Sequence, residues 1–498
     1  MRLMRPIRPI TQSPMKRLPL LLCLLACAGY ASAQVDITYD DEAEWKAYDD
    51  FNTAFLDRAN NKYIYKADTK QPKADHRGNG YRDNNDDSGC AAAIWCQAIM
   101  YDMVINAYNR AKGEGDTYRM SKYKTLHDRI YSAEKSHYVS FNFDNCNTNN
   151  GWFVYDDIMW WTCALARAYE TFKKSEYLTY SEKSFCRVWY GSTKVGDDGS
   201  YADPARFSGS AGGGMFWEWQ PIDNPNPHQP GDFRSACINF PTVIAACLLH
   251  RLVPVGRTAP TSPNPTRQTK EWYLEKAKEV YAWADKTLVN SSGRVADGIH
   301  GGGPEYSDHL YNQATYIGAS CMLYLLTHEI SYLTKAQRAA NYVTNNMCSS
   351  AILKYENGYE QGIYAAIYAQ YIKMFIYDCG LSEAMMRKYM AHIQRNIQKA
   401  YNNMDQTRGI QIGNFAKATG ENDVVESYGA SGMPALMLMF PASDTATPIN
   451  TLNQEKYDGP SDVYTPEGKL IMKNATPEQV HRLDSGLYIF QRKKVLVK

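Results

Sequence analysis

The feature that most constrains the fold of this chain is an alternation between helices that carry charge and helices that carry little. Residues 270–289 form a predicted amphipathic helix, whose apolar stripe includes Tyr273, Ala277 and Val280 and whose other faces carry many Lys, Glu and Asp side chains. The next helical segment, residues 311–328, contains no Lys, Arg, Asp or Glu. A helix that is apolar on every side has to be buried, so the two segments belong to different layers.

This contrast recurs along the chain and predicts an all-α fold. About twelve helical segments are expected before residue 440, and no convincing parallel-strand pattern lies between them. The segments are near residues 41–60, 90–111, 118–136, 155–173, 176–190, 233–253, 270–289, 311–328, 332–351, 361–379, 382–402 and 424–440. Alternating exposed and buried helices fit two concentric rings, an (α/α)6 barrel in which every second helix is an inner one. The loops before the inner helices would then meet at one rim, and loops on a rigid scaffold commonly carry function.

A stack of helical repeats is the competing arrangement, since it also pairs helices. Such a stack would show self-similar motifs with a period of roughly 34 to 47 residues, and the sequence contains none. With 44% hydrophobic residues, the chain can bury a large core. Its formal net charge of +1 lacks the basic excess of proteins that neutralise a phosphate backbone, so we expect no nucleic-acid partner.

The first 33 residues have the pattern of an export signal. Basic residues precede an apolar run at residues 18–28, and the Ala-Ser-Ala at residues 31–33 is a small-residue cleavage site. The run is shorter than the roughly 20 apolar residues that span a bilayer, and no later stretch reaches that length. A second interpretation places cleavage before Cys27, because residues 24–27 resemble a lipoprotein box that would add a lipid anchor. Both interpretations predict an exported protein without a membrane span, located at the cell surface, in the periplasm or secreted.

The end of the chain differs from the helical part that covers residues 34–440. Residues 441–461 are rich in Pro, Thr, Ser, Asp and Asn and predict a linker. Alternating β-forming residues in the remaining segment, 462–498, predict a small strand-rich module. This tail resembles the C-terminal sorting domains of type IX bacterial secretion, which would direct the protein outward. The alternative is a β appendage that packs on the main domain.

Neither a cofactor nor a metal is expected. The 12 cysteines lack the paired close spacing of a zinc site, and the choice of any disulfide partners stays open. Residues 301–304 lack the ending of a phosphate loop, and no His-Glu-x-x-His zinc motif occurs. The acidic run at residues 83–87 is followed by Ser88 and Ile94 where a calcium loop needs Gly and Glu, which favours an ordinary solvated loop.

Two adjacent carboxylates at the start of a buried helix are the sharpest candidates for chemistry. Asp156 and Asp157 lie among five aromatic residues in the segment 151–161. Successive helical side chains diverge by about 100°, so we expect the carboxyl groups to lie roughly 5 to 6 Å apart, close to the separation in retaining glycosidases. Two carboxyl groups so close repel each other when both are ionised. One aspartate would therefore stay protonated as the acid while the other attacks as the nucleophile. The alternative is that a carboxylate caps the helix.

This segment resembles the catalytic segment of glycoside hydrolase family 76, the retaining endo-α-1,6-mannanases. Ordered motifs carry the resemblance from about residue 90 to 440: Tyr155-Asp156-Asp157 with Trp160-Trp161 and Ala164-Leu165-Ala166, then Gly212-Gly213-Gly214-Met215-Phe216-Trp217, Asp297-Gly298 and Tyr311-Asn312-Gln313. The resemblance implies that Asp156 is the nucleophile and Asp157 the general acid/base. The sequence departs from the family pattern at residues 234–239, at Leu310 and Ala314, and in a Pro-rich insertion at residues 223–232. These departures concern the sugar subsites.

The motifs also supply candidate sugar-binding residues. Glycines let a backbone approach a sugar ring closely, an indole can stack on the ring, and amide or charged groups can bond its hydroxyls; each residue also has an ordinary alternative as a turn, core or cap residue. The candidates are Trp152, Tyr155, Gly213, Gly214, Trp217, Arg234, Asn239, Asp297, Tyr311 and Asn312.

The resemblance implies a monomeric, retaining endo-hydrolase that cleaves α-1,6-linked mannan backbones by a two-aspartate mechanism, with α-mannan polysaccharide or oligosaccharide as its partner. One alternative is a non-catalytic helical protein that captures glycans at a surface. Another is an exo-α-mannosidase or a transglycosylase on the same barrel. The sequence leaves open the tolerance of branched mannan and the number of subsites.

Overall fold

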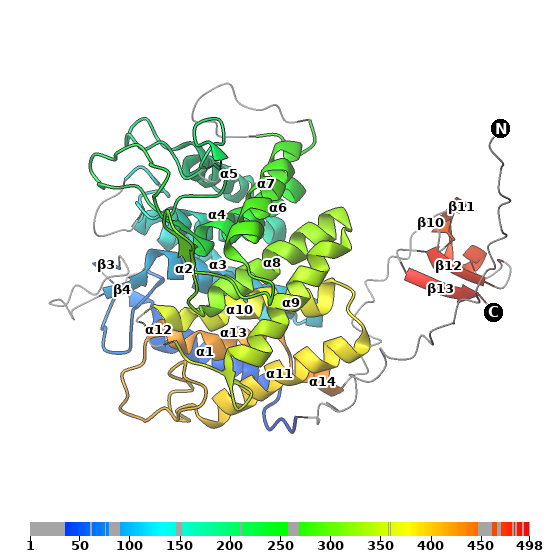
Figure 1. The fold of residues 1–498 in the computed structure, drawn as a ribbon. Coiled ribbons are helices and arrows are strands. Elements are labelled where there is room, and N and C mark those ends of the chain that lie inside the picture. The colour runs from blue at the N-terminus through cyan, green and yellow to red at the C-terminus, as the bar shows by residue number, and fades with distance from the viewer. Residues whose placement is uncertain are drawn as a thin grey trace, which may run out of the picture.

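A computed structural model gives the fold of the chain (Figure 1). It describes residues 35–59, 62–74, 76–78, 90–145, 152–209, 212–256, 268–356, 358, 360–446, 461–465, 470–480, 483, 486–490 and 493–497. The predicted export signal at residues 1–33 with Cys27, the acidic run at residues 83–87 and most of the predicted linker at residues 441–461 lie outside the described residues.

Six helical stretches form a closed inner ring, in which each contacts the next and the last returns to the first (Figure 1). They are α2 (Ile94–Glu114), α4 (Tyr155–Phe172), α6 (Ala236–Leu252), α8 (Leu310–Thr327), α10 (Tyr364–Lys373) with a π-helical turn at Met374–Asp378, and α13 (Gly432–Met439) preceded by the short α12 (Ser427–Ala430). Every residue from 236 to 249 and from 312 to 323 is buried, as expected for helices that are apolar on all sides.

The other helices form the outer ring, and each packs against an inner neighbour. They are α1 (Asp41–Phe55), α3 (Thr117–His137), α5 (Ser175–Tyr190), α7 (Lys270–Leu288), α9 (Ile330–Asn346) and α11 (Glu383–Asn402). Each has one wet face; α7 buries Tyr273, Ala277, Val280, Ala284 and Leu288, which recur every three or four residues along one side. The predicted (α/α)6 barrel is therefore confirmed, and every second helix is an inner one.

Several predicted helices differ from the structure at their ends. The helix predicted at 41–60 ends at Phe55 and the one predicted at 332–351 ends at Asn346, because a short strand follows each. Residues 90–93 belong to the strand β4 (Cys90–Ala93), which pairs in parallel with β3 (His76–Gly78), so the helix begins at Ile94. The backbone N–H of Ala93, the residue before this helix, donates to the Tyr428 hydroxyl at 3.0 Å. The segment predicted at 424–440 begins as α12 and continues as α13.

Short strands join the loops of the barrel. β1 (Leu56–Asp57) pairs with β2 (Ile64–Tyr65), and β8 (Cys348–Ser349) pairs with β9 (Ile352–Leu353). β5 (Arg234–Ser235), β6 (Gly298–Ile299) and β7 (Pro304–Glu305) form a three-stranded antiparallel sheet. This sheet ties the start of α6 to the loop that leads into α8.

The C-terminal module is a four-stranded antiparallel sheet, as the sequence predicts for a β appendage. Its strands β10 (Ser461–Tyr464), β11 (Leu470–Ala475), β12 (Gly486–Phe490) and β13 (Lys493–Val497) have the order β11-β10-β12-β13. The short helices α14 (Ser443–Ala446) and α15 (Pro477–Val480) precede the module and lie within it, respectively. Val463, Ala475 and Val480 form a small hydrophobic cluster of their own. The resemblance to a sorting domain stays a prediction.

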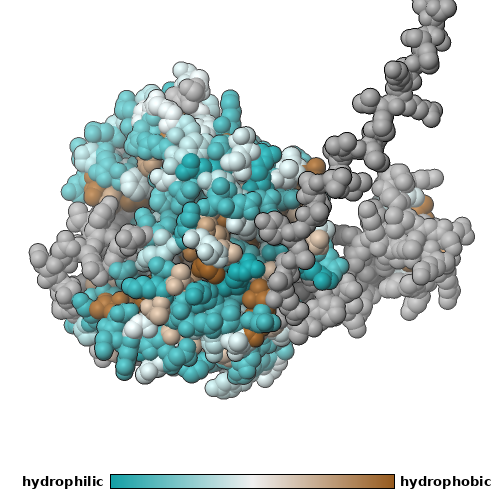
Figure 2. All heavy atoms as spheres, turned by 60° about the horizontal axis from the view of Figure 1, so that its bottom comes forward, coloured by the Kyte–Doolittle hydropathy of each residue, from teal (hydrophilic) through white to brown (hydrophobic). Residues whose placement is uncertain are grey.

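The face of the molecule in Figure 2 is covered largely by hydrophilic side chains, with hydrophobic ones in small groups. The large apolar side chains of the barrel instead form one continuous core between the two rings. Of the helices that the structure describes, none is both long enough and apolar enough to cross a membrane.

Candidate active site

The inner helices begin at one end of the barrel, and the loops before them meet there. The bond from the Ala93 N–H to the Tyr428 hydroxyl joins the starts of α2 and α12. The Ala236 N–H, at the start of α6, donates to the Asp297 carbonyl in the loop before α8 at 2.8 Å. Residues far apart in the sequence are therefore gathered at this rim.

The segment that leads into α4 is fixed by a second rim segment. The Tyr155 N–H donates to the Trp217 carbonyl at 2.8 Å, and the Trp219 N–H donates to the Phe153 carbonyl at 3.1 Å. This pairing holds the half-buried Trp217 beside the first turn of α4, where its side chain contacts the Asp156 carboxyl group.

Asp156 and Asp157 both lie in that first turn, and each is 7% exposed. The N-cap residue of α4 is Val154, and no side chain makes a capping hydrogen bond there. Neither aspartate is therefore the N-cap residue, although a backbone N–H of this first turn contributes a hydrogen bond to the Asp156 carboxyl group. The start of a helix does favour a negative charge, which helps one of the pair to ionise.

The two aspartates have different electrostatic environments. Burial raises the pKa of Asp156 to about 6, and polar hydrogens of Cys237, Trp160 and Trp217 limit that rise. Burial raises the pKa of Asp157 well above its usual range, and the negative charge of Asp156 raises it further. Because the groups repel each other when both are charged, Asp156 loses its proton first and Asp157 keeps its own.

A third carboxyl group, that of Glu360, faces the aspartates from the loop before α10. The Trp95 Nε1–H, in the first turn of α2, donates to Glu360 Oε2 at 2.5 Å. Burial raises the pKa of Glu360 to about 7; the Trp95 bond opposes this rise and the charge of Asp156 adds to it. Sequence motifs point to neither Glu360 nor Trp95. The available signal is position, since both lie where an inner helix begins.

Three more predicted residues, Tyr311, Asn312 and Asp297, lie close to one another near Asp156. Asn312 is fully buried, and its Nδ2 donates to Asp297 Oδ1 at 3.0 Å. The Tyr311 ring stacks on that of Tyr364, with ring centroids 4.0 Å apart. Burial raises the pKa of the Tyr311 hydroxyl well above its usual range, and negative charges that include Asp297 and Asp156 contribute. The hydroxyl therefore stays protonated near Asp156, and Asn312 orients Asp297.

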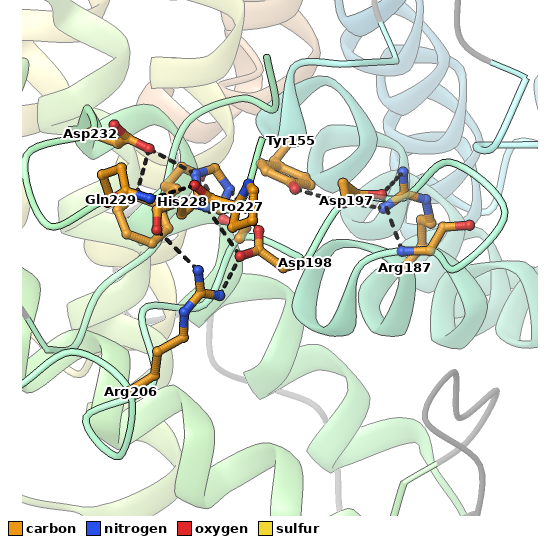
Figure 3. Close-up of polar contacts among 12 residues, drawn as sticks. Tyr155, Arg187, Asp197, Asp198, Arg206, Pro227, His228, Gln229 and Asp232 are labelled. Atoms are coloured by element: carbon orange, nitrogen blue, oxygen red, sulfur yellow. Dashed lines mark hydrogen bonds and ion pairs between the residues drawn. The ribbon is translucent and has the colours of Figure 1, made fainter. Parts of the chain in front are cut away.

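Tyr155 and Trp152 support the segment from behind (Figure 3 for Tyr155). The Tyr155 hydroxyl donates to Asp197 Oδ2 at 2.7 Å, and Arg187 pairs with the same carboxylate at 2.9 Å. Trp152 is 1% exposed and packs edge-on against Phe143. Both side chains are enclosed by protein, so they present no surface to a sugar here, unlike the role that the sequence predicted.

The glycine loop packs on the outer ring. A Cβ atom added to Gly213 or Gly214 would lie 2.7 or 2.3 Å from ring atoms of Trp283 on α7. Arg234 covers the same indole at 4.8 Å and donates to the Gly213 carbonyl at 3.0 Å. Asn239 is fully buried and accepts a backbone N–H of this loop at 2.9 Å. The close approach that these glycines allow is thus to Trp283, and all four predicted residues serve to build the loop that carries Trp217.

The Pro-rich insertion at residues 223–232 is anchored to the same loop region (Figure 3). The His228 N–H donates to Asp198 Oδ2 at 3.1 Å, and Arg206 donates to the His228 carbonyl at 3.0 Å. The His228 ring stacks on Phe216 with centroids 4.1 Å apart. The insertion therefore forms part of the wall behind Trp217.

An open groove of about 1200 Å³ runs along the rim between the loops that lead into α10 and α12. Its lining includes Tyr355, Gly358, Asn414 and Glu426. None of Asp156, Asp157 and Glu360 is among its lining residues.

Comparisons with known proteins agree with this architecture. The chain matches the family model described as Glycosyl hydrolase family 76 over residues 65–445. An α-1,6-mannanase of Salegentibacter sp. HEL1_6 is similar in structure, with 21% identity and a TM-score of 0.60 over 80% of this chain and 98% of that chain. A Listeria innocua protein has 21% identity and a TM-score of 0.59 over 80% and 96% of the two chains. A comparison with curated protein sequences gives no match.

A family 76 mannosidase of Bacteroides thetaiotaomicron VPI-5482 is also similar, with 15% identity and a TM-score of 0.57 over 80% of this chain and 96% of that chain. The Salegentibacter enzyme has also been solved as an inactive variant, with two neighbouring aspartates replaced by asparagine, in complex with α-1,6-mannotriose. These likenesses show the shared barrel fold.

Proposed function

The chain belongs to glycoside hydrolase family 76, and from that membership we propose that it is a monomeric, retaining endo-α-1,6-mannanase. The observation that carries the proposal is the position of two adjacent, buried aspartates in the first turn of one inner helix. Burial and mutual repulsion leave Asp156 as the group that ionises first and Asp157 as the group that keeps its proton. Retaining glycoside hydrolysis needs this pair of states, a nucleophile beside an acid.

In the proposed reaction, Asp156 attacks the anomeric carbon of a bound mannosyl residue. Asp157 donates its proton to the glycosidic oxygen as the bond to the leaving sugar breaks, and a covalent mannosyl ester forms on Asp156. Asp157, now ionised, then takes a proton from water, and the resulting hydroxide displaces Asp156 from the sugar. Two displacements at the same carbon restore the original configuration, and both aspartates return to their starting states.

One comparison supports an α-1,6-linked mannan as the substrate. The structurally similar Salegentibacter enzyme, a member of the same family by its name, has been solved with α-1,6-mannotriose as an inactive variant in which two adjacent aspartates are replaced. We propose that Asp156 and Asp157 are the corresponding pair in this chain.

Incubation with linear α-1,6-mannan tests the proposal. A mixture of oligosaccharides supports endo action. Mannose as the only product supports an exo-α-mannosidase, lengthened chains support a transglycosylase, and binding without release supports a glycan-capture protein; each of these three results contradicts the endo-hydrolase proposal.

Replacement of the aspartates tests the assigned roles. Asp156→Asn and Asp157→Asn should each lower turnover by about 100-fold or more, whereas Asp223→Asn changes an exposed carboxylate of the insertion and should leave turnover unchanged. With an activated aryl mannoside and azide, Asp157→Ala should yield the α-mannosyl azide and Asp156→Ala the β-mannosyl azide. The opposite pairing would exchange the two roles.

We further propose that residues 1–33 direct export and that residues 462–498 take part in sorting the protein outward. The basic and apolar pattern of the first segment and the small-residue site before Gln34 support the first proposal. The strand-rich tail supports the second.

A further inference from the structure

Glu360 is a half-buried acidic residue for which the proposed two-aspartate reaction has no use. It lies one residue before the helical turn Gln361–Ile363 that leads into α10, and its Oε2 accepts the Trp95 Nε1–H at 2.5 Å. Trp95 belongs to the first turn of α2, so the bond joins the start of α2 to the segment that leads into α10. This contact fixes where the carboxyl group lies.

The other carboxyl oxygen of Glu360 is buried and has no hydrogen-bond partner among the described residues. A buried carboxylate oxygen without a donor is costly, and such an atom in a native fold calls for an explanation. No lysine or arginine is among the groups that act on it; those that interact with it are Trp95, Asp156, Asp157 and the Cys96 thiol. Among the described residues, the fold thus holds an acceptor in place and supplies no donor for it.

A carboxyl group in this position is also unfavourable for its neighbours. The negative charge of Glu360 raises the pKa of Asp157, and the negative charge of Asp156 raises that of Glu360. Three carboxyl groups that repel one another lower the stability of the barrel rim, which is the usual cost of a functional site. A sugar offers what the site lacks, because every free hydroxyl can donate a hydrogen bond.

We propose that Glu360 is a substrate-binding residue, whose Oε1 accepts a hydrogen bond from a hydroxyl group of the mannosyl residue held against Asp156 and Asp157. This inference rests on the proposed function of the site. Trp95 positions the acceptor by holding Oε2, and its half-buried ring lies against Trp160 and Tyr364, with centroids 6.0 and 6.4 Å away. These aromatic rings hold the Glu360 carboxyl group in one orientation. Its hydrogen bond to the substrate therefore selects a hydroxyl at one position of the sugar ring.

Binding in a catalytically silent background tests the inference. In Asp156→Asn protein, calorimetric titration with α-1,6-mannotriose measures affinity without turnover. Adding Glu360→Ala should weaken binding about ten-fold or more, the usual weight of a hydrogen bond to a charged group. Adding Trp95→Phe, which keeps the ring and removes the donor, should weaken binding less. Adding Glu421→Gln, a change to an exposed carboxylate on the neighbouring loop, should leave binding unchanged.

Deoxy sugars identify the partner hydroxyl. Of a set of α-1,6-mannobiosides that each lack one hydroxyl, one should bind the Asp156→Asn protein about ten-fold more weakly and bind Asp156→Asn/Glu360→Ala no more weakly than the parent sugar does. Equal losses for every deoxy sugar in both proteins would overturn the inference. So would unchanged mannotriose affinity in Glu360→Ala.

Three further measurements separate this inference from a structural role and from failure of the proposed function. Glu360→Ala should melt at the same temperature as the parent or higher, because it removes a repelling buried charge; a lower melting temperature with unchanged affinity would mean a structural role. In otherwise wild-type protein, Glu360→Gln should shift the basic limb of the kcat/KM profile to lower pH, since Asp157 would lose its proton more easily. Wild-type protein that releases nothing from mannan would refute the proposed function itself.

Discussion

Gly214→Ala separates a supporting role of the glycine loop from a sugar-binding one. The new methyl carbon would lie 2.3 to 2.6 Å from ring atoms of Trp283, and the residue would keep a φ of +77°. Overpacking of this kind costs about 1–3 kcal/mol, and a left-handed backbone conformation adds roughly 1 kcal/mol for a residue with a side chain. The indole cannot move aside freely, because Arg234 covers it. We therefore expect the free energy of unfolding to fall by about 2–4 kcal/mol.

Urea unfolding, followed by tryptophan fluorescence, measures the loss, and initial rates on mannan at a temperature far below melting measure function. The account predicts a lower urea midpoint with KM almost unchanged. Gly113→Ala is the matched control, because Gly113 lies in α2 with open space around its Cβ position, so alanine should leave stability equal or raise it by up to about 1 kcal/mol. An unchanged midpoint with a raised KM in Gly214→Ala would refute the supporting role.

Three more predictions concern the site, the wall behind it and the chain start. Cys237→Ala removes the thiol whose hydrogen bond lowers the pKa of Asp156. Since Asp156 must be ionised to attack, the acidic limb of the kcat/KM profile should shift to higher pH. A shift to lower pH would contradict the role of Asp156 as nucleophile. Arg187→Ala leaves Asp197 buried without its cation beside Tyr155 and should lower the free energy of unfolding by about 3–5 kcal/mol; a loss below 1 kcal/mol in urea titration would contradict this. Mass spectrometry of the exported protein should find Gln34 as the first residue, whereas an acylated Cys27 would establish the lipoprotein alternative.

The ring architecture could be predicted from sequence because charge is excluded from whole helices. Residues 311–328 carry no charged side chain, and the structure buries them from 312 to 323. The aspartate pair could also be predicted, since adjacent residues at a helix start lie close together whatever the rest of the fold. Both features can be read from neighbouring residues in the sequence, without knowing which distant segments come into contact.

Contacts between distant segments could not be predicted. Trp95 and Glu360 are 265 positions apart and meet only because the inner ring closes. Gly214 looks the same in sequence whether its free face meets a sugar or Trp283, and Tyr155 gives no sign that its hydroxyl will bond Asp197. A family motif preserves such residues for either reason, so residue type alone cannot separate a sugar contact from a supporting one.

Covalent trapping identifies which of the two aspartates is the nucleophile. A 5-fluoro-α-mannosyl fluoride should load the enzyme quickly and leave it slowly, because fluorine destabilises the positively charged transition states of both steps. Peptide mass spectrometry should then find one mannosyl ester, on Asp156, and Asp156→Asn protein should remain unlabelled. A stable label on Asp157 or Glu360, or rapid turnover of the reagent with inversion and no label, would contradict the proposal that Asp156 attacks while Asp157 carries the proton.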